Sequence, residues 1–163
     1  MGRSILHCNF LNTKNTIMAN VKLLELKKLQ TNFPAVKITS SNTSAEFIRQ
    51  FYSDDLGIFE SFFVLLLNRQ NVTTGYAKIS QGGVSGTVVD VKIIAKYAVD
   101  FLASSVILAH NHPSGNLNPS TQDIEVTKKV KQALSLLDVQ VLDHIILTEE
   151  SYYSFTDNSL ILF

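Results

Sequence analysis

Two histidines and an aspartate lie close together in the stretch AHNHPSGNLNPSTQD, residues 109–123. His110 and His112 follow an apolar run and are separated by one residue, so on an extended backbone both side chains lie on one face. Such pairs commonly bind zinc through imidazole nitrogens. Asp123 follows a loop with two prolines and a glycine, which can fold the chain back towards the histidines. Together the three side chains would fill three positions of a tetrahedral site and leave the fourth for water, as in catalytic zinc sites.

The same residues also have a structural interpretation. In STQD, Ser120 can cap a helix by accepting a hydrogen bond from the amide of Asp123, while the Asp123 carboxylate reaches back. A single histidine at a strand end is usually a half-buried hydrogen-bonding residue. Two histidines beside a carboxylate are harder to explain in this way, because nothing obvious would compensate their protonation. We therefore favour the metal site, with Asp123 serving both purposes.

Glu60 is the best candidate for a proton carrier outside the metal shell. Zinc lowers the pKa of a bound water to about 7 and so supplies a nucleophile near neutral pH. A carboxylate that moves the proton would complete this chemistry. Glu60 stands immediately before a buried apolar run, where a lone charge has little other purpose. The alternative is a solvated residue at the start of a strand, and spacing alone does not decide between the two.

Alternating helices and strands would position these residues. Continuous apolar runs such as FFVLLL and SVILA predict strands buried on both faces, and apolar residues at helical spacing predict helices. We predict helices over 44–52 (capped by Ser44), 89–103 and 120–137, and strands over 62–68, 72–80, 105–110, 139–148 and 152–155, the last at an edge. This order predicts a mixed sheet flanked by helices, a three-layer fold of the α/β or α+β class.

The polar residues around this framework have simpler interpretations. His144 alternates away from its apolar neighbours and is expected to hydrogen-bond within the fold rather than bind metal. Ser114 and Asn116 are expected to shape the rim of the loop. Residues 1–20 show no clear period and are expected to form a loose arm, with Met18 as an alternative start. Residues 21–30 fit a helix or a strand, and we favour a strand.

The charge balance and the cysteine content of the chain indicate which partners and which cellular compartment to expect. Fourteen basic residues balance fourteen acidic ones, so the net charge gives no support to binding of nucleic acid or of an anionic membrane. The one cysteine, Cys8, excludes an intramolecular disulfide and a thiolate-rich zinc site, which favours a reducing, cytoplasmic location. The first residues make a poor signal peptide, and the apolar runs are too short to span a bilayer.

The polar residues reproduce a known pattern. Glu60, then His110 and His112, then Asp123 with a serine three residues before it, resembles the JAMM signature of the MPN/JAB metalloproteases. More narrowly, four segments resemble the bacterial RadC-type branch: ILAHNHPSGNLNPSTQDIEVTKK, FFVLLLNRQN, SQGGVSGT and LLDVQVLDHIIL. The resemblance runs from about residue 39 to the C-terminus, and its blocks occur in the right order.

The resemblance implies an MPN/JAB-like fold and a hydrolase with one Zn²⁺ per chain. His110, His112 and Asp123 would be the ligands, Glu60 the general acid/base, and Ser120 a donor to the developing oxyanion. It divides the chain into an N-terminal arm or short extension, 1–38, and an MPN domain, 39–163. Long RadC-type proteins also carry a helix-hairpin-helix region associated with DNA binding. Residues 1–38 lack its glycine-punctuated hairpins.

Three functions are therefore open. The leading hypothesis is a zinc metallopeptidase or isopeptidase that cleaves an amide bond of an unknown peptide or protein. The alternative is a DNA-repair-associated RadC-like accessory protein without peptidase activity. A third is a hydrolase of a non-peptide substrate, because the ligand set fixes the nucleophile and not the bond. The sequence does not specify the oligomeric state.

Overall fold

The computed structural model describes residues 31–52, 56–82 and 88–160, which belong to the compact unit Thr31–Phe163. Several predictions lie outside these residues: the arm over 1–20, the start at Met18, the thiol of Cys8 and the strand over 21–30. The structure therefore bears on the predicted elements from residue 31 onwards.

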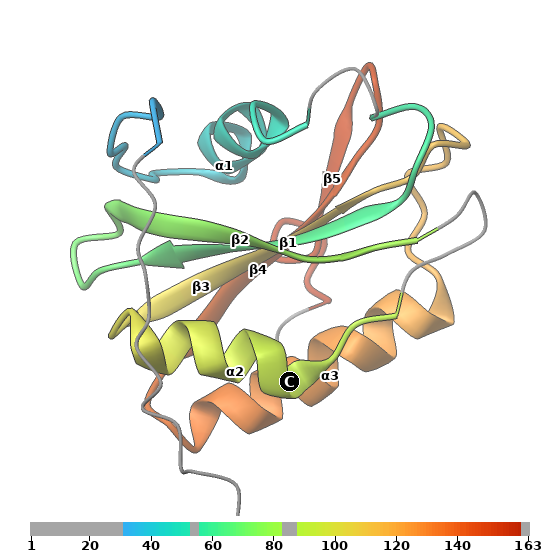
Figure 1. Ribbon diagram of the computed structural model, residues 1–163. Helices are drawn as coiled ribbons and strands as arrows, with labels where there is room; N and C mark the ends of the chain where they lie inside the picture. The colour runs from blue at the N-terminus through green and yellow to red at the C-terminus, as the bar shows by residue number, and fades with distance from the viewer. Residues whose placement is uncertain (1–30, 53–55, 83–87, 161–163) are drawn as a thin grey trace, which may run out of the picture. The chain divides into compact units, whose positions relative to one another are not determined.

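The described residues form three helices and five strands in the predicted order. The elements are α1 (Ser41–Arg49), β1 (Ser61–Leu67), β2 (Thr73–Gln81), α2 (Val91–Asp100), β3 (Ser105–Asn111), α3 (Thr121–Ser135), β4 (Gln140–Leu147) and β5 (Tyr152–Ser154). The strands make one sheet in the order β2-β1-β3-β4-β5, which Figure 1 shows. Only the β3–β4 pairing is parallel, so the sheet is mixed, and β5 lies at its edge as predicted. None of these helices has the length and apolar character needed to cross a membrane.

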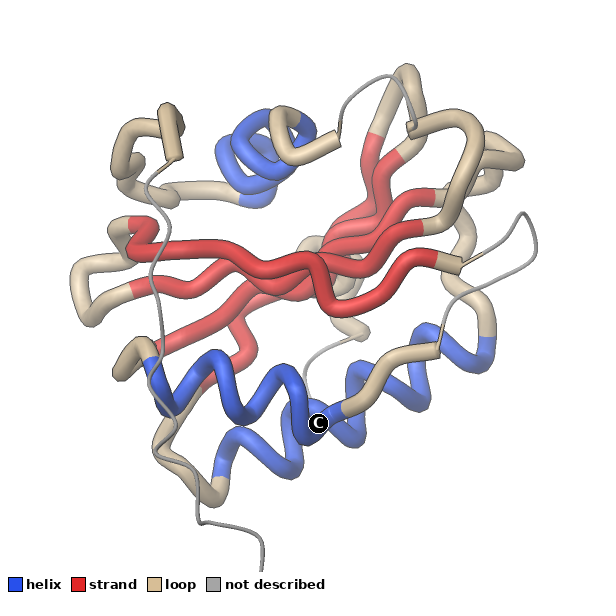
Figure 2. Tube along the Cα trace, in the orientation of Figure 1, coloured by secondary structure: helices blue, strands red, loops and turns tan. Residues whose placement is uncertain are grey.

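The sheet lies between two helical layers. Figure 2 shows α1 over one face and α2 with α3 over the other. Alternate side chains of β1 enter two cores: Phe62 and Val64 pack beneath α2 and α3, while Phe63 and Leu65 pack beneath α1. Because both faces are covered, every residue of β1 and β3 is buried, as the continuous apolar runs predict. The predicted three-layer α+β fold is confirmed.

The first helix begins earlier than predicted. Its N-cap is Ser40, whose side chain accepts a hydrogen bond from the amide of Thr43. Ser44, the predicted cap, lies inside the helix, is buried, and donates from Oγ to the Ser40 carbonyl at 3.0 Å. The prediction was wrong because the first turn is entirely polar, so the apolar pattern begins one turn after the helix does.

The second and third helices end earlier than predicted. Leu102 and Leu137 continue the apolar pattern but lie beyond the helices, with 86% and 45% of their surfaces exposed. Leu102 itself and Asp138, which follows Leu137, have positive φ angles of 50° and 55°. This left-handed backbone ends each helix, and it is not visible in hydrophobic periodicity.

Residues 31–38 lie against the domain. The Val36 amide donates to Thr73 Oγ1 at 2.9 Å, and the Thr73 amide donates to the Val36 carbonyl at 2.9 Å. Ile38 is buried in the core beneath α1. These contacts tie the segment to β2. A domain boundary between residues 38 and 39 stays a prediction.

Candidate metal centre

His110, His112 and Asp123, here called the His–His–Asp cluster, meet at one end of β3. His110 lies near the end of this central strand, where it pairs with Phe62 of β1 and Ile146 of β4, and it is 1% exposed. His112 follows the strand, and its amide donates to the Leu147 carbonyl of β4 at 2.9 Å. Asp123 lies in the first turn of α3. The structure thus brings the three predicted ligands together, from positions 13 residues apart at most.

The spacing of the cluster matches a tetrahedral metal site. The two histidine Nε2 atoms are 3.0 Å apart. His110 Nε2 is 3.2 Å from Asp123 Oδ1, and His112 Nε2 is 3.6 Å from Asp123 Oδ2. Tetrahedral ligands about 2.0–2.1 Å from a zinc ion lie about 3.3–3.4 Å from one another. The cluster therefore fits zinc by donor type and by spacing.

Neighbouring hydrogen bonds hold the histidine rings with Nε2 towards the cluster. His112 Nδ1 donates to the Asn116 carbonyl at 2.6 Å, so when this ring is neutral its lone pair is on Nε2. His110 Nδ1 contacts His144 Nε2 at 2.8 Å. Asn116 was predicted only to shape the loop rim, but its backbone orients a candidate ligand. Partners of this kind fix the ring orientation of metal-binding histidines.

The electrostatics of the cluster favour a positive charge at its centre. Burial alone would raise the pKa of Asp123, but its contacts with the His110 and His112 imidazoles outweigh burial and hold that pKa well below its usual range. The contact with Asp123 raises the pKa of His112 above its ordinary value of 6.5, against the opposing effect of burial. A proton on His112 or a bound cation would supply this charge.

Asp123 also serves the helix cap, as predicted. The Asp123 amide donates to Ser120 Oγ at 3.1 Å, and the Ser120 amide donates to Asp123 Oδ2 at 2.7 Å. Ser120 Oγ donates to the same Oδ2 at 2.6 Å. The cap occupies Oδ2 and leaves Oδ1 directed at His110. The structural and the metal-binding interpretations of this aspartate are therefore compatible.

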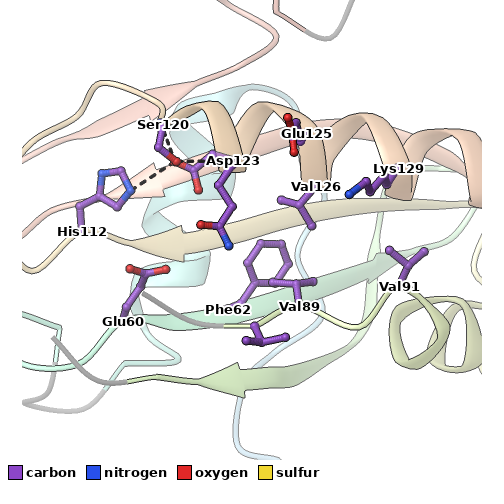
Figure 3. Close-up of a pocket in the computed structure, with 12 residues that line it drawn as sticks. Glu60, Phe62, Val89, Val91, His112, Ser120, Asp123, Glu125, Val126 and Lys129 are labelled. Atoms are coloured by element: carbon purple, nitrogen blue, oxygen red, sulfur yellow. Dashed lines mark hydrogen bonds and ion pairs between the residues drawn. The ribbon is translucent and has the colours of Figure 1, made fainter. Parts of the chain in front are cut away.

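Glu60 faces the His–His–Asp cluster across a pocket of about 370 Å³. In Figure 3 its carboxylate lies opposite His112, with Ser120 and Asp123 along the upper wall. The Glu60 carbonyl accepts from the Gly82 amide at 2.9 Å, which fixes the backbone just before β1. The negative charge of Glu60 contributes to the raised pKa of His112. The predicted proton carrier is thus near the predicted ligands without being one of the cluster.

Asn111, between the two histidines, is a residue that the sequence analysis missed. Its side chain is fully buried on the opposite side of the strand and accepts from the Ser61 amide at 2.8 Å. Its Nδ2 donates to the carbonyls of Leu56 and Phe59 at 2.6 and 2.8 Å. Asn111 thereby fixes the segment that carries Glu60. The signal was a polar residue inside a buried strand, where its polar atoms need partners.

His144 hydrogen-bonds within the fold, as predicted. It is fully buried in β4, with Nδ1 at 2.6 Å from Thr127 Oγ1 and Nε2 at 2.8 Å from His110 Nδ1. Burial, reinforced by the neighbouring His110, lowers the pKa of His144 well below its ordinary value. His144 therefore contacts a candidate ligand but is not itself in the cluster.

Comparisons with known proteins agree with this architecture. A family model described as "RadC-like JAB domain" matches residues 38–160. The chain is 43% identical over 145 residues to a UPF0758 protein of Flavobacterium johnsoniae, covering 89% of this chain and 62% of that protein. It is 40% identical over 147 residues to a UPF0758 protein of Porphyromonas gingivalis, covering 90% and 64%. The chain thus spans a little over three fifths of the length of these relatives.

Proposed function

The chain belongs to the RadC-like JAB domain family, and on that premise we propose that it is a zinc-dependent hydrolase that cleaves an amide bond of a peptide or protein. The JAB family includes hydrolases. The observation that carries the proposal is the convergence of two imidazole nitrogens and a carboxylate within 3.0–3.6 Å, beside a pocket whose lining also includes the Glu60 carboxylate. A purely structural metal site would instead be closed by four protein ligands.

In the proposed mechanism, His110, His112 and Asp123 hold the metal. A zinc ion bound there would polarise the scissile carbonyl and activate a water molecule. Glu60 would accept a proton from the attacking water and return it to the leaving nitrogen, which is the work of a general acid/base. The position of Glu60 across the pocket from His112 supports this role.

Ser120 would donate a hydrogen bond to the oxyanion as the carbonyl is attacked. In the structure its hydroxyl hydrogen is directed at Asp123 Oδ2 instead, over 2.6 Å. The Ser120 amide also donates to that oxygen at 2.7 Å, so the carboxylate stays capped when the hydroxyl turns away. A rotation about one side-chain bond would therefore free the donor for substrate.

The pocket suits a substrate with an apolar group next to the cleaved bond. Beyond the cluster its apolar lining includes Phe62 of β1, Val89 and Val91 at and just before the start of α2, and Val126 of α3, beside the charged Glu125 and Lys129 (Figure 3). This surface supports a peptide substrate more directly than a nucleic acid.

The experiment is a comparison of metal-stripped and zinc-restored protein on peptide, isopeptide and non-peptide ester substrates. The proposal expects amide hydrolysis that is lost on stripping and returns with zinc. If the protein hydrolysed only the ester, the proposed metal chemistry would stand but the proposed peptide substrate would be wrong. Zinc-loaded protein that cleaves nothing, yet binds DNA in a salt-dependent way, would favour the accessory role instead.

A further inference from the structure

The candidate ligands His110 and Asp123 are joined by a chain of hydrogen bonds through two residues outside the cluster. Thr127 Oγ1 donates to the Asp123 carbonyl at 2.6 Å, one turn earlier in α3. Thr127 Oγ1 also contacts His144 Nδ1 at 2.6 Å, and His144 Nε2 contacts His110 Nδ1 at 2.8 Å. All of these side-chain atoms are buried or nearly so. The chain therefore runs from the backbone of one ligand to the ring of the other.

The direction of each hydrogen bond in this chain is determined by the inventory of donors. A carbonyl can only accept, so the single hydroxyl hydrogen of Thr127 points at Asp123. The contact with His144 must then be donated by His144 Nδ1. A neutral imidazole has one N–H, and a charged ring would be costly at a fully buried position, so His144 Nε2 carries a lone pair.

The tautomer of His144 in turn determines that of the candidate ligand His110. His144 Nε2 can only accept, so His110 Nδ1 donates to it. The neutral His110 ring then has its lone pair on Nε2, the atom that lies 3.0 Å from His112 Nε2 and 3.2 Å from Asp123 Oδ1. This is the tautomer that a metal ion requires, because the coordinating nitrogen must be free of hydrogen.

Packing holds the His144 ring in the orientation that this chain needs. Phe155 stacks on it with ring centroids 4.7 Å apart, and Phe62 meets it edge-on at 5.4 Å. Phe62 also stacks on His110 at 5.9 Å. A flip of the His144 ring would break both of its hydrogen bonds within a buried site, so a single arrangement is favoured.

We propose that Thr127 and His144 are positioning residues that fix His110 in its Nδ1–H tautomer and so present the Nε2 lone pair to the metal. The metal-binding part of this inference rests on the proposed function. The tautomer part concerns hydrogen bonds within the chain and does not. Neither residue touches the metal, and their effect reaches it only through His110.

The matched pair Thr127→Val and Thr127→Ser isolates the hydroxyl. Valine keeps the shape of threonine but removes the acceptor of the His144 N–H, which frees His144 to take its other tautomer. His144 would then donate from Nε2 and force His110 to carry its hydrogen on the metal-facing nitrogen. Serine keeps the hydroxyl and should keep the wild-type tautomer. His144→Phe removes the acceptor of His110 outright.

Two measurements on the full chain test the proposal. Long-range ¹H–¹⁵N correlation spectra of the histidine rings, recorded on metal-free protein at a pH where the rings are neutral, report which nitrogen carries hydrogen. We expect Nδ1–H for His110 and His144 in wild type and Thr127→Ser, and a mixture in Thr127→Val. Zinc affinity by chelator competition should fall about tenfold in Thr127→Val and about 10–100-fold in His144→Phe.

The outcomes separate the two proposals. Nε2–H on His110 in the wild type would overturn the positioning role, as would a folded Thr127→Val variant with wild-type tautomers and zinc affinity. A role in stability alone would lower the melting temperature of Thr127→Val without changing either readout, and this also contradicts the inference. If wild type shows the expected tautomers but binds no zinc, the proposed metal chemistry fails while the tautomer assignment stands.

Discussion

Asp123 uses its two carboxylate oxygens for different purposes. Oδ2 accepts from the amide and hydroxyl of Ser120, and Oδ1 faces His110. The sequence shows the capping box through the spacing of serine and aspartate alone. It cannot show which oxygen stays available, because that depends on the angle at which α3 meets the end of β3. Residue types and spacing thus predicted that Ser120, Asp123 and the histidines lie together, and the structure shows which carboxylate oxygen each of them contacts.

Replacing Glu60 with glutamine tests the proton carrier. Glu60→Gln keeps size and polarity but cannot accept a proton, so turnover on an identified substrate should fall by roughly 10²–10⁴-fold. Zinc content and melting temperature should stay at their wild-type values, because Glu60 is outside the His–His–Asp cluster.

Glu125→Gln is the matched control, since it removes the same charge from the lining of the same pocket. It should lower turnover far less than Glu60→Gln. If both variants lowered turnover equally, Glu60 would contribute only to the negative charge of the pocket. If Glu60→Gln lost its zinc, Glu60 would be a metal ligand instead of a proton carrier.

Replacing Ser120 with alanine should affect both stability and rate. Ser120→Ala removes the N-cap of α3, which costs about 0.5–2 kcal/mol in the free energy of unfolding. It also removes the proposed oxyanion donor, so kcat should fall beyond what a partly unfolded sample explains. Urea unfolding and initial rates measure the two effects separately. A stability loss with an unchanged kcat would leave Ser120 as a cap alone.

Among the elements, β3 positions more of the site than any other. It carries His110 on one face and Asn111 on the other, and it lies between β1, which follows Glu60, and β4, which carries His144. The apolar runs predicted these strands well, because a strand that is buried on both faces needs apolar side chains at nearly every position. The pairing order did not follow from the runs. The partners of Asn111 and His144 therefore could not be predicted, since Asn111 bonds to β1 and to the segment before it, and His144 bonds to β3 and α3.

Helix ends were harder to predict than helix bodies for a related reason. The start of α1 depends on Ser40 meeting the Thr43 amide, in a run of polar residues where several could serve as a cap. The capping box of α3 was predicted correctly because Ser120 and Asp123 reinforce each other. The start of α3 was predictable from two residues that cap each other, whereas the start of α1 depends on a single capping serine.

Replacing Asn111 with alanine should loosen the segment before β1. The change leaves one amide and two carbonyls without their buried partner, and should lower the free energy of unfolding by at least about 2 kcal/mol. Hydrogen exchange of the Ser61 amide should accelerate more than that of amides in the middle of β4. Asn68→Ala, which also removes an asparagine with backbone contacts but at an exposed turn, should destabilise less. If hydrogen exchange of the Ser61 amide were unchanged in Asn111→Ala, Asn111 would not fix the segment before β1.

The buried core is drawn from residues 38–155 of the described chain. The chain spans a little over three fifths of the relatives' length, so the activity of the whole protein in those relatives is a separate question. The described residues of Thr31–Phe163 include the cluster, the pocket and Glu60. We therefore assign the proposed chemistry to this domain.

Removal of residues 1–30 tests that assignment. Thr31–Phe163 forms a compact unit and includes the contacts of Val36 and Ile38 with the sheet and α1. The shortened chain should keep the melting temperature and the zinc affinity of the full chain. A cut after residue 38 should be destabilising by comparison, because it deletes those contacts. A large loss of stability from the first cut would show that the domain needs its N-terminal residues.

The number of zinc ions retained per chain is the decisive test of the His–His–Asp cluster. Purified protein, stripped with a chelator and dialysed against zinc, should retain about one ion per chain, as three protein ligands with one open position imply. His112→Ala and Asp123→Ala should each lose retained zinc while remaining folded by circular dichroism. Asp157→Ala, which removes a carboxylate whose partner is Ser41 on α1, should retain the full complement. Zinc bound equally by wild type and both ligand variants, or by none of them, would contradict the account.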